Sequence, residues 1–236
     1  MEARTALGRL NRLRPLLRRA NRRFGVPRYS WLIDRANWEA RLYSTVSTFP
    51  DALELPSREA LHSYVGRELL DGDAKAIDYL EFGVYRGKTF REWCARNRSS
   101  GSRFFGFDSF EGLPEDWTPQ RPVGAFDTGG QTPEIDDARA EFVVGWFQHS
   151  LPDFLRSYQP QDQLVLHVDC DLYSSTLYCL SMLDDVITPG TIVIFDEFYD
   201  SLHEYRALTD YCSAYLRDYR LIAHTEDLMQ AVVTIL

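Results

Sequence analysis

Two short apolar runs in this chain each end in a pair of acidic residues. The run LVLHV is followed by Asp169 and Asp171, and the run TIVIF is followed by Asp196 and Glu197. Asp169 and Asp196 are 27 residues apart, a spacing that fits one helical crossover between neighbouring parallel strands. Parallel strands bring their carboxyl ends to one edge of a sheet, where open α/β sheets bind their ligands. The pattern therefore predicts a parallel sheet with a carboxylate-rich site.

The chain after Ile77 supports this fold class. Short apolar runs alternate with helical patterns, which is typical of a mostly parallel sheet with helices on both faces. We expect seven strands, the last two (YRLIAHT and MQAVVTIL) forming an antiparallel hairpin at the sheet edge. The other expected strands are IDYLEF, RFFGFD, EFVVGW, LVLHVD and TIVIFDE. The expected helices cover residues 87–97, 150–157, 173–185 and 202–217.

The chain is expected to have three parts, namely a basic N-terminal arm (1–28), a helical lead-in (29–76) and the α/β domain (77–236). The arm holds nine Arg and one Glu, so its formal charge is +8 and the remaining chain carries −17. We expect the arm to form helix and to join subunits into a homo-oligomer, or else to pack on the body of the chain; an interfacial helix on anionic lipid and disorder are the alternatives. Within residues 37–72, which look helical, Ser57 is a candidate N-cap.

Charge and hydropathy exclude several classes of function. The acidic body does not fit nucleic-acid binding, which requires a basic surface. There is no apolar run of 18 residues and no visible signal peptide, so we expect a cytoplasmic protein without a transmembrane segment. The expected partner is a small hydroxylated molecule. The four cysteines have no metal-type spacing and are expected to be reduced; they are Cys94, Cys170, Cys179 and Cys212.

The stretch YLEFGVYRGKTF predicts a cofactor site. Gly83 and Gly87 allow the backbone to approach a ligand closely at the start of a helix. Asp108 follows Gly87 by 21 residues, the placement of an acid that binds ribose hydroxyls. Glu81 places negative charge beside the turn, which disfavours a pyrophosphate and hence an NAD-linked oxidoreductase. A carboxylate there suits the cationic S-adenosylmethionine (SAM).

The paired carboxylates predict a metal site. Crowded carboxylates repel each other, so one takes up a proton or the group binds a cation. Oxygen ligands without a cluster of His or Cys favour Mg²⁺ over Ca²⁺ or Mn²⁺. Asp171 or Ser174 could instead cap the helix that begins near Tyr173.

Five motifs together resemble one known family. EFGVYRG, FGFDSFEGLPE, GWFQHSLP, VDCDLYSST and IFDEFY occur in the order and spacing of the macrocin O-methyltransferase family. The resemblance covers residues 77–236. It implies a Rossmann-like class I methyltransferase that uses SAM, and typically Mg²⁺, to methylate sugar hydroxyls of macrolide and aminocoumarin antibiotics.

The resemblance also implies roles for individual residues. It places Glu81, Gly83 and Asp108 on SAM, with Ser109 and Trp146 near the adenosine, and we group Tyr85 and Gly87 of the same turn with them. It assigns Asp169, Asp196 and Glu197 as metal ligands. The chain departs from the family at two positions, because Glu197 replaces the second of two aspartates and His149 replaces an acid.

Methyl transfer requires a base for the acceptor hydroxyl. Asp169 or Asp171 is the first candidate and His149 the second, whereas His167 lies within an apolar strand and is expected to be core. The leading hypothesis is a Mg²⁺-dependent O-methyltransferase of a sugar or glycosylated metabolite. The alternatives are a catechol or phenol O-methyltransferase and a non-catalytic SAM-binding subunit. The long connection at 111–137, with Trp117 and Phe126, is expected to be functional and suits either acceptor.

Overall fold

The computed structural model describes residues 30–72 and 75–236, so the expected arm at 1–28 lies outside the described residues. Residues Leu42–Leu236 form one compact unit, and helix α2 (Ser30–Ser47) begins before it. Among the helices in the described ranges, none is long and apolar enough to cross a bilayer. All four cysteines are buried as free thiols.

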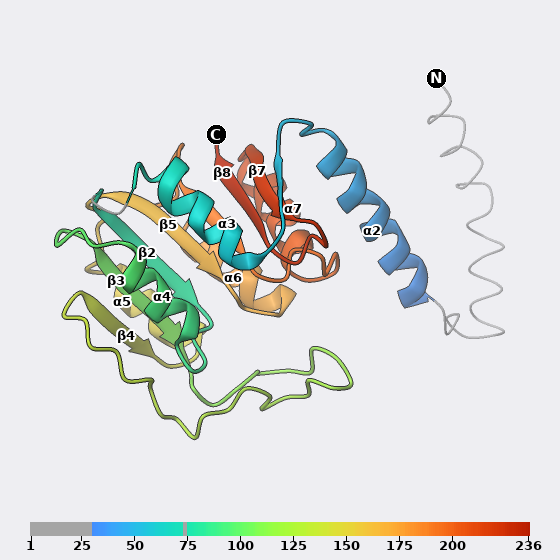
Figure 1. Ribbon diagram of the computed structural model, residues 1–236. Helices are drawn as coiled ribbons and strands as arrows, with labels where there is room; N and C mark the ends of the chain where they lie inside the picture. The colour runs from blue at the N-terminus through green and yellow to red at the C-terminus, as the bar shows by residue number, and fades with distance from the viewer. Residues whose placement is uncertain (1–29, 73–74) are drawn as a thin grey trace, which may run out of the picture. The chain divides into compact units, whose positions relative to one another are not determined.

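One eight-stranded sheet organises the compact unit, in the order β1-β7-β8-β6-β5-β2-β3-β4 (Figure 1). Only β8 runs antiparallel to its neighbours, β6 and β7, and the other strand pairs are parallel. The strands are β1 (Leu53–Leu55), β2 (Ile77–Phe82), β3 (Arg103–Asp108), β4 (Ala140–Val144), β5 (Gln163–Val168), β6 (Ile192–Phe195), β7 (Tyr219–Thr225) and β8 (Ala231–Ile235).

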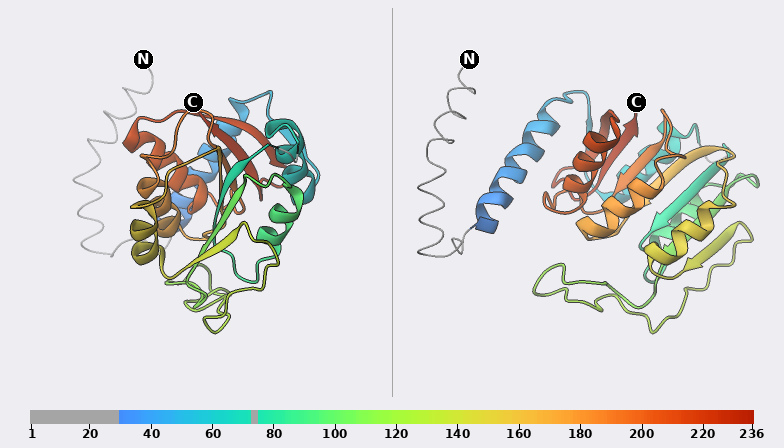
Figure 2. Two further views of the ribbon diagram at one scale, coloured as in Figure 1. Left: turned by 90° about the vertical axis from the view of Figure 1, so that its left-hand side faces the viewer. Right: turned by 180° about the vertical axis from the view of Figure 1, so that it is seen from behind.

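Helices cover both faces of this sheet. Helices α3 and α4 lie on one face, and α5, α6 and α7 lie on the other (Figures 1 and 2). The helices of the compact unit are α3 (Arg58–Tyr64), the π-helical turn η1 (Val65–Leu69), α4 (Lys88–Arg96), α5 (Phe147–Leu155), α6 (Tyr173–Met182) and α7 (Glu204–Tyr215). The predicted α/β class and the antiparallel β7–β8 hairpin are confirmed.

The expected strand count of seven is wrong, because β1 adds an eighth strand outside the hairpin. This strand has only three residues, too few for a period-two pattern, and it is held by pairing with β7, far along the chain. It also divides the segment 37–72, which is not continuously helical. The predicted N-cap is confirmed, since the Ser57 hydroxyl accepts a hydrogen bond from the Ala60 N–H at 3.2 Å.

The core explains why the central strands lack polar–apolar alternation. All six residues of β2 and all four of β6 are buried, because helices pack on both faces. On the α4 side, Phe90 and Trp93 pack on Tyr79, with ring centroids 6.2 and 5.1 Å away. This packing fixes β2 in the middle of the sheet, and its carboxyl end opens onto the site described next.

Candidate functional site

The carboxyl ends of the central parallel strands lie level with one another. In the strand register, Phe82 of β2 pairs with Val168 of β5, which pairs with Phe195 of β6. The residues that follow these strands therefore meet at one edge. A pocket of about 290 Å³ opens there.

The turn after β2 forms one wall of the pocket. Gly83 has φ +96°, and a Cβ atom built on it would lie 1.8 Å from the backbone oxygen of Asp169. Only glycine therefore allows the ends of β2 and β5 to approach this closely. Gly87, with φ +69°, caps α4, and its own Cβ would lie 2.7 Å from Pro133. Gly83 and Tyr85 line the pocket, whereas Gly87 does not.

Asp108, at the end of β3, holds that turn in place and also lines the pocket. One carboxylate oxygen accepts the backbone N–H groups of Val84 and Tyr85, both at 2.8 Å, and the other accepts that of Phe110 at 2.8 Å. These bonds join the turn after β2 to the loop after β3. The contact of Asp108 with ribose stays a prediction.

Four other predicted site residues occupy different places. Ser109 and Trp146 line the pocket, Ser109 after β3 and Trp146 at the start of α5. His149 is exposed in the first turn of α5 and is not part of the pocket lining. Glu81 is 1 % exposed and lies outside the lining, where it accepts a hydrogen bond from the Tyr79 hydroxyl.

Three carboxylates come together at the pocket. Oxygen atoms of Asp169, Asp171 and Glu197 lie within 4.8 Å of one another, and all three residues line the pocket. The backbone of Asp171 has φ +58°, a conformation that costs a non-glycine residue stability. Within residues 30–72 and 75–236, the buried Oε2 of Glu197 has no hydrogen-bond partner. The group therefore concentrates negative charge without enough donors to satisfy it.

The pKa values of this group follow from burial and mutual repulsion. Burial, together with Asp196 and Asp171, raises the pKa of Asp169 well above its ordinary value. Burial and nearby Asp196 raise the pKa of Asp171 to about 7. Burial and Asp169 raise the pKa of Glu197 to about 12. Without a bound cation, the group therefore retains protons at neutral pH.

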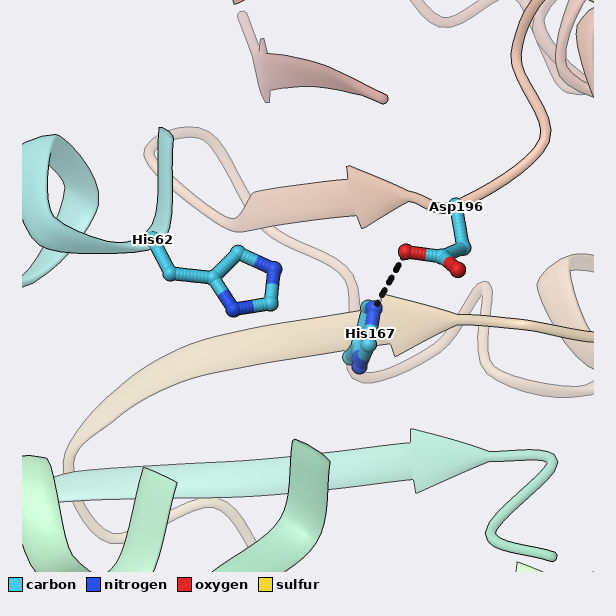
Figure 3. A group of neighbouring side chains, drawn as sticks. All are labelled: His62, His167 and Asp196. Atoms are coloured by element: carbon cyan, nitrogen blue, oxygen red, sulfur yellow. Dashed lines mark ion pairs between the residues drawn. The ribbon is translucent and has the colours of Figure 1, made fainter. Parts of the chain in front are cut away.

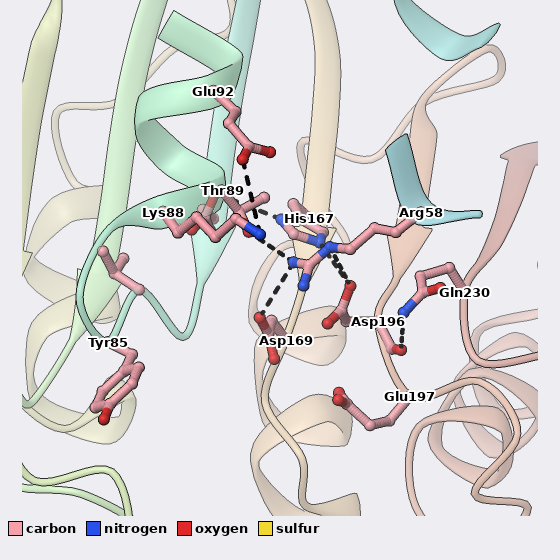
Figure 4. A network of polar contacts seen from close by, with 12 residues as sticks. Arg58, Tyr85, Lys88, Thr89, Glu92, His167, Asp169, Asp196, Glu197 and Gln230 are labelled. Carbon is pink, nitrogen blue, oxygen red and sulfur yellow. Dashed lines mark hydrogen bonds and ion pairs between the residues drawn. The ribbon is translucent and has the colours of Figure 1, made fainter. Parts of the chain in front are cut away.

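Asp196 does not join these three residues, although it was predicted to bind the same metal. Its Oδ1 lies 3.1 Å from Nε of Arg58 and 3.7 Å from Nε2 of His167 (Figure 4). Arg58 also approaches Asp169, with Nη2 3.8 Å from Oδ2, and donates to Thr89 at 2.6 Å. The guanidinium thus lies between the two aspartates as a built-in cation.

The alternation of side chains along a strand accounts for the separation of Asp196 from Glu197. His167 of β5 is paired in register with Glu81 of β2 and with Ile194 of β6. Asp196 is two residues after Ile194, so it faces the same side of the sheet as His167 and Glu81. Its neighbour Glu197 faces the other way, into the pocket. Counting alternate residues does not by itself give the pocket group, because Asp169, two residues after His167, also lines the pocket.

Glu204 is a positioning residue that the motifs did not reveal. It is fully buried in the first turn of α7. One carboxylate oxygen accepts the backbone N–H of Cys170 at 3.2 Å, and the other accepts that of Glu197 at 3.0 Å. Glu204 thereby ties the loop after β5 to the loop after β6. The sequence offers little signal for this role, because an acidic residue in the first turn of a helix is ordinary.

The long connection between β3 and β4 forms the outer wall of the pocket. Trp117, Arg121 and Phe126 line it. The Arg121 guanidinium lies 5.4 Å from the Phe126 ring centroid, and the Tyr85 ring meets Phe126 edge-on at 5.5 Å. This wall therefore offers aromatic surface and one cation beside the carboxylates.

The sequence of this chain is similar to those of known methyltransferases. A protein-family model described as a methyltransferase domain matches residues 80–198, just over half of the chain. The chain is 28% identical to 8-demethyl-8-(2,3-dimethoxy-alpha-L-rhamnosyl)-tetracenomycin-C 4'-O-methyltransferase of Streptomyces olivaceus, with 61% of this chain and 67% of the relative covered.

Solved structures share the fold. CalS11, described as a calicheamicin methyltransferase, superposes with a TM-score of 0.56 at 20% identity, covering 85% of this chain and 92% of its own. The O-methyltransferase NovP gives a TM-score of 0.55 at 19% identity, covering 86% of this chain and 98% of its own. These likenesses confirm the Rossmann-like class I fold.

Proposed function

The chain belongs to the family of methyltransferase domains, and from that premise we propose that its acceptor is a sugar hydroxyl of a glycosylated metabolite. The protein is a SAM-dependent O-methyltransferase, as the resemblance of its motifs implied. The curated relative methylates a rhamnosyl group carried on tetracenomycin. One observation carries the proposal furthest: the three-carboxylate group lies in the same pocket as the glycine turn.

We place SAM against the glycine turn. Gly83 allows the ends of β2 and β5 to meet beside the pocket, and the Asp108 carboxylate keeps the turn in shape. Ser109 and Trp146 border the same part of the pocket. Glu81 lies behind the turn in a buried network, so we expect it to act on the cationic cofactor through its charge.

The donor set of the carboxylate group fits a hard divalent cation such as Mg²⁺. Asp169, Asp171 and Glu197 would hold it through oxygen atoms, which Mg²⁺ prefers. The buried Oε2 of Glu197, which lacks a hydrogen-bond partner in the described structure, supports this assignment. When bound, the ion would lower the pKa of the acceptor hydroxyl and favour its ionised form.

The residues of the pocket would perform the remaining work of methyl transfer. The acceptor oxygen forms a bond to the methyl carbon as the sulfur–methyl bond of SAM breaks, so alignment of the two molecules dominates catalysis. We propose that Asp171, which lines the pocket, would hold the cation through one carboxylate oxygen and accept the hydroxyl proton on the other. The products are the methyl ether and S-adenosylhomocysteine.

The aromatic wall supports a bulky glycosylated acceptor. Trp117 and Phe126 present ring surface beside the carboxylates, and aromatic faces pack well on sugar and polyketide rings. The Trp117 indole is fixed by a hydrogen bond from Nε1 to Asp200 at 3.3 Å. We therefore expect Trp117→Ala to raise the KM for the acceptor more than the KM for SAM.

Two linked assays test this function. Calorimetric titration of SAM into wild type, Asp171→Asn and Glu197→Gln should show binding in all three. Incubation with SAM and a rhamnosylated tetracenomycin acceptor should add one methyl group, detected by mass, and release S-adenosylhomocysteine. We expect Mg²⁺ to stimulate the wild type and Asp171→Asn to lose turnover by about 100-fold or more. Methylation of a catechol alone would overturn the sugar assignment, and turnover unaffected by chelator would overturn the metal assignment.

A further inference from the structure

Three buried donor atoms converge on the face of the sheet opposite the pocket. His62 comes from α3, His167 from β5, and Asp196 directly follows β6 (Figure 3). Their exposed fractions are 1 %, 0 % and 5 %. One donor atom from each residue lies within 4.8 Å of the other two.

No hydrogen bond satisfies these donor atoms, although Oδ1 of Asp196 forms an ion pair with Nε of Arg58 at 3.1 Å. Among the residues that the structure describes, Nε2 of His62, Nε2 of His167 and Oδ1 of Asp196 have no hydrogen-bond partner. Each buried polar atom left in this state costs about 1–3 kcal/mol. Two unpartnered imidazole nitrogens therefore face a carboxylate oxygen, and the three atoms, from three separate elements, point to a ligand that contacts them all. A single cation with nitrogen and oxygen ligands does so.

The surroundings of the cluster match those of a metal site. Nδ1 of His167 lies 2.9 Å from the Tyr79 hydroxyl and 3.4 Å from Oε2 of Glu81. Metal-binding histidines commonly present their second ring nitrogen to a carboxylate in this way, which fixes the ring and leaves the other nitrogen for the metal. Ligating carboxylates are themselves supported by hydrogen-bond donors, and Arg58 stands 3.1 Å from Asp196.

We propose that His62, His167 and Asp196 bind a divalent transition-metal ion of the Zn²⁺ type, separate from the three-carboxylate group in the pocket. Imidazole nitrogen favours Zn²⁺ and its neighbours in the transition series over Mg²⁺. Zinc ligands lie about 2.0–2.1 Å from the ion, so the three donor atoms must draw together by roughly 1 Å. The ion would fasten α3 to β5 and β6.

A metal ion at this cluster would also affect the pocket, through helix α3 and Arg58. His62 lies in α3, outside the matched methyltransferase segment, and the same helix carries Arg58. A metal at the cluster would fix α3 and therefore the guanidinium that lies between Asp169 and Asp196. The proposed role is structural, and it does not depend on the identity of the methyl acceptor.

A proton is the competing occupant of this cluster. Burial alone would lower the pKa of His167, but Asp196 and Glu81 beside it raise that pKa to about 10. A protonated His167 would satisfy part of the negative charge, although it would leave Nε2 of His62 without a partner. Direct measurement of bound metal distinguishes the two occupants.

The test uses the untagged full-length chain, stripped with a chelator and then titrated with Zn²⁺, Co²⁺ or Mg²⁺ alone. We expect one tightly bound Zn²⁺ or Co²⁺ per chain, with a Co²⁺ absorption spectrum typical of nitrogen and oxygen ligands. His62→Gln and His167→Gln should each weaken that binding by at least about 10- to 100-fold. Mg²⁺ should not compete at this site.

Matched controls separate this site from others. His224 is also buried, but in β7 and away from the cluster, so His224→Gln should keep the ion. Asp171→Asn alters the pocket group and should also keep it. The proposal is overturned if stripped wild type binds no Zn²⁺ or Co²⁺, or if His62→Gln binds them as tightly as wild type. Absence of Zn²⁺ and Co²⁺ binding by wild type overturns the proposal without any variant, and His167→Gln stands in if His62→Gln fails to fold.

Discussion

Replacing Glu204 by Gln would test how the two carboxylate loops are held together. Each carboxylate oxygen of Glu204 accepts one backbone N–H, from Cys170 at 3.2 Å and from Glu197 at 3.0 Å. Glutamine has the same size, but one of its two terminal atoms is a donor. At least one of the two buried N–H groups must therefore lose its acceptor.

The expected loss of stability follows from the one buried N–H group that loses its acceptor. One unsatisfied buried N–H costs about 1–3 kcal/mol, and in a protein of this size each kcal/mol lowers Tm by about 2–4 °C. Differential scanning fluorimetry should therefore show a fall of roughly 2–12 °C. Loosening the two loops should also weaken Mg²⁺ binding by about 10-fold or more, measured by calorimetry, with little change in SAM affinity.

A control variant makes this result interpretable. Glu141→Gln alters an exposed glutamate on β4 and should change stability by less than about 0.5 kcal/mol. If Glu204→Gln melts within about 1 °C of wild type, the two bonds do not hold the loops. The assignment of Glu204 as a positioning residue would then be wrong.

Two further predictions concern pH and the glycine turn. Burial raises the pKa values of Asp171 to about 7 and Glu204 to about 8, so the folded state holds protons that the unfolded state has already released. Without divalent cations, the free energy of unfolding should therefore fall as pH rises from 6.5 to 8.5, by up to about 1.4 kcal/mol per pH unit for each group, and Tm should fall with it. His167, with its raised pKa, adds in the same direction. Excess Mg²⁺ should restore much of the loss, and a Tm that rises over this range would contradict the account. Gly83→Ala should cost at least about 3 kcal/mol and abolish SAM binding, because its Cβ would lie 1.8 Å from a backbone oxygen. Gly124→Ala, also at positive φ but in open space, should cost only about 1 kcal/mol and keep SAM binding.

Much of the fold was predictable because its signals are local. The strands that contain Glu81 and His167 are buried and mostly apolar, and glycine and aspartate mark where these strands end. Strand β1 was not predictable, because its three residues are held by pairing with β7 rather than by their own pattern. The positions of Arg58 and His62 depend on how α3 packs on the sheet, which residue spacing within that helix does not encode.

The ends of the predicted strands located the carboxylate site but did not give the direction in which each acidic side chain points. Strand ends were enough to bring Asp169, Asp171 and Glu197 to one edge. Adjacent residues along a strand, however, face opposite sides of the sheet, and of the two residues that follow β6 only Glu197 lines the pocket. Asp196 instead faces the buried histidines.

The two sides of this sheet edge therefore carry different sets of potential metal ligands. The pocket side offers only oxygen donors, as Mg²⁺ and a hydroxyl acceptor require. The opposite side adds two imidazoles to a carboxylate and is sealed by α3, which suits a structural ion and excludes substrate. Arg58 lies between the two sides, in contact with Asp169 and Asp196. Because one guanidinium touches both carboxylates, loss of an ion on the buried side should shift Asp169 on the pocket side, so metal-free protein and His62→Gln should share the same altered affinity for Mg²⁺.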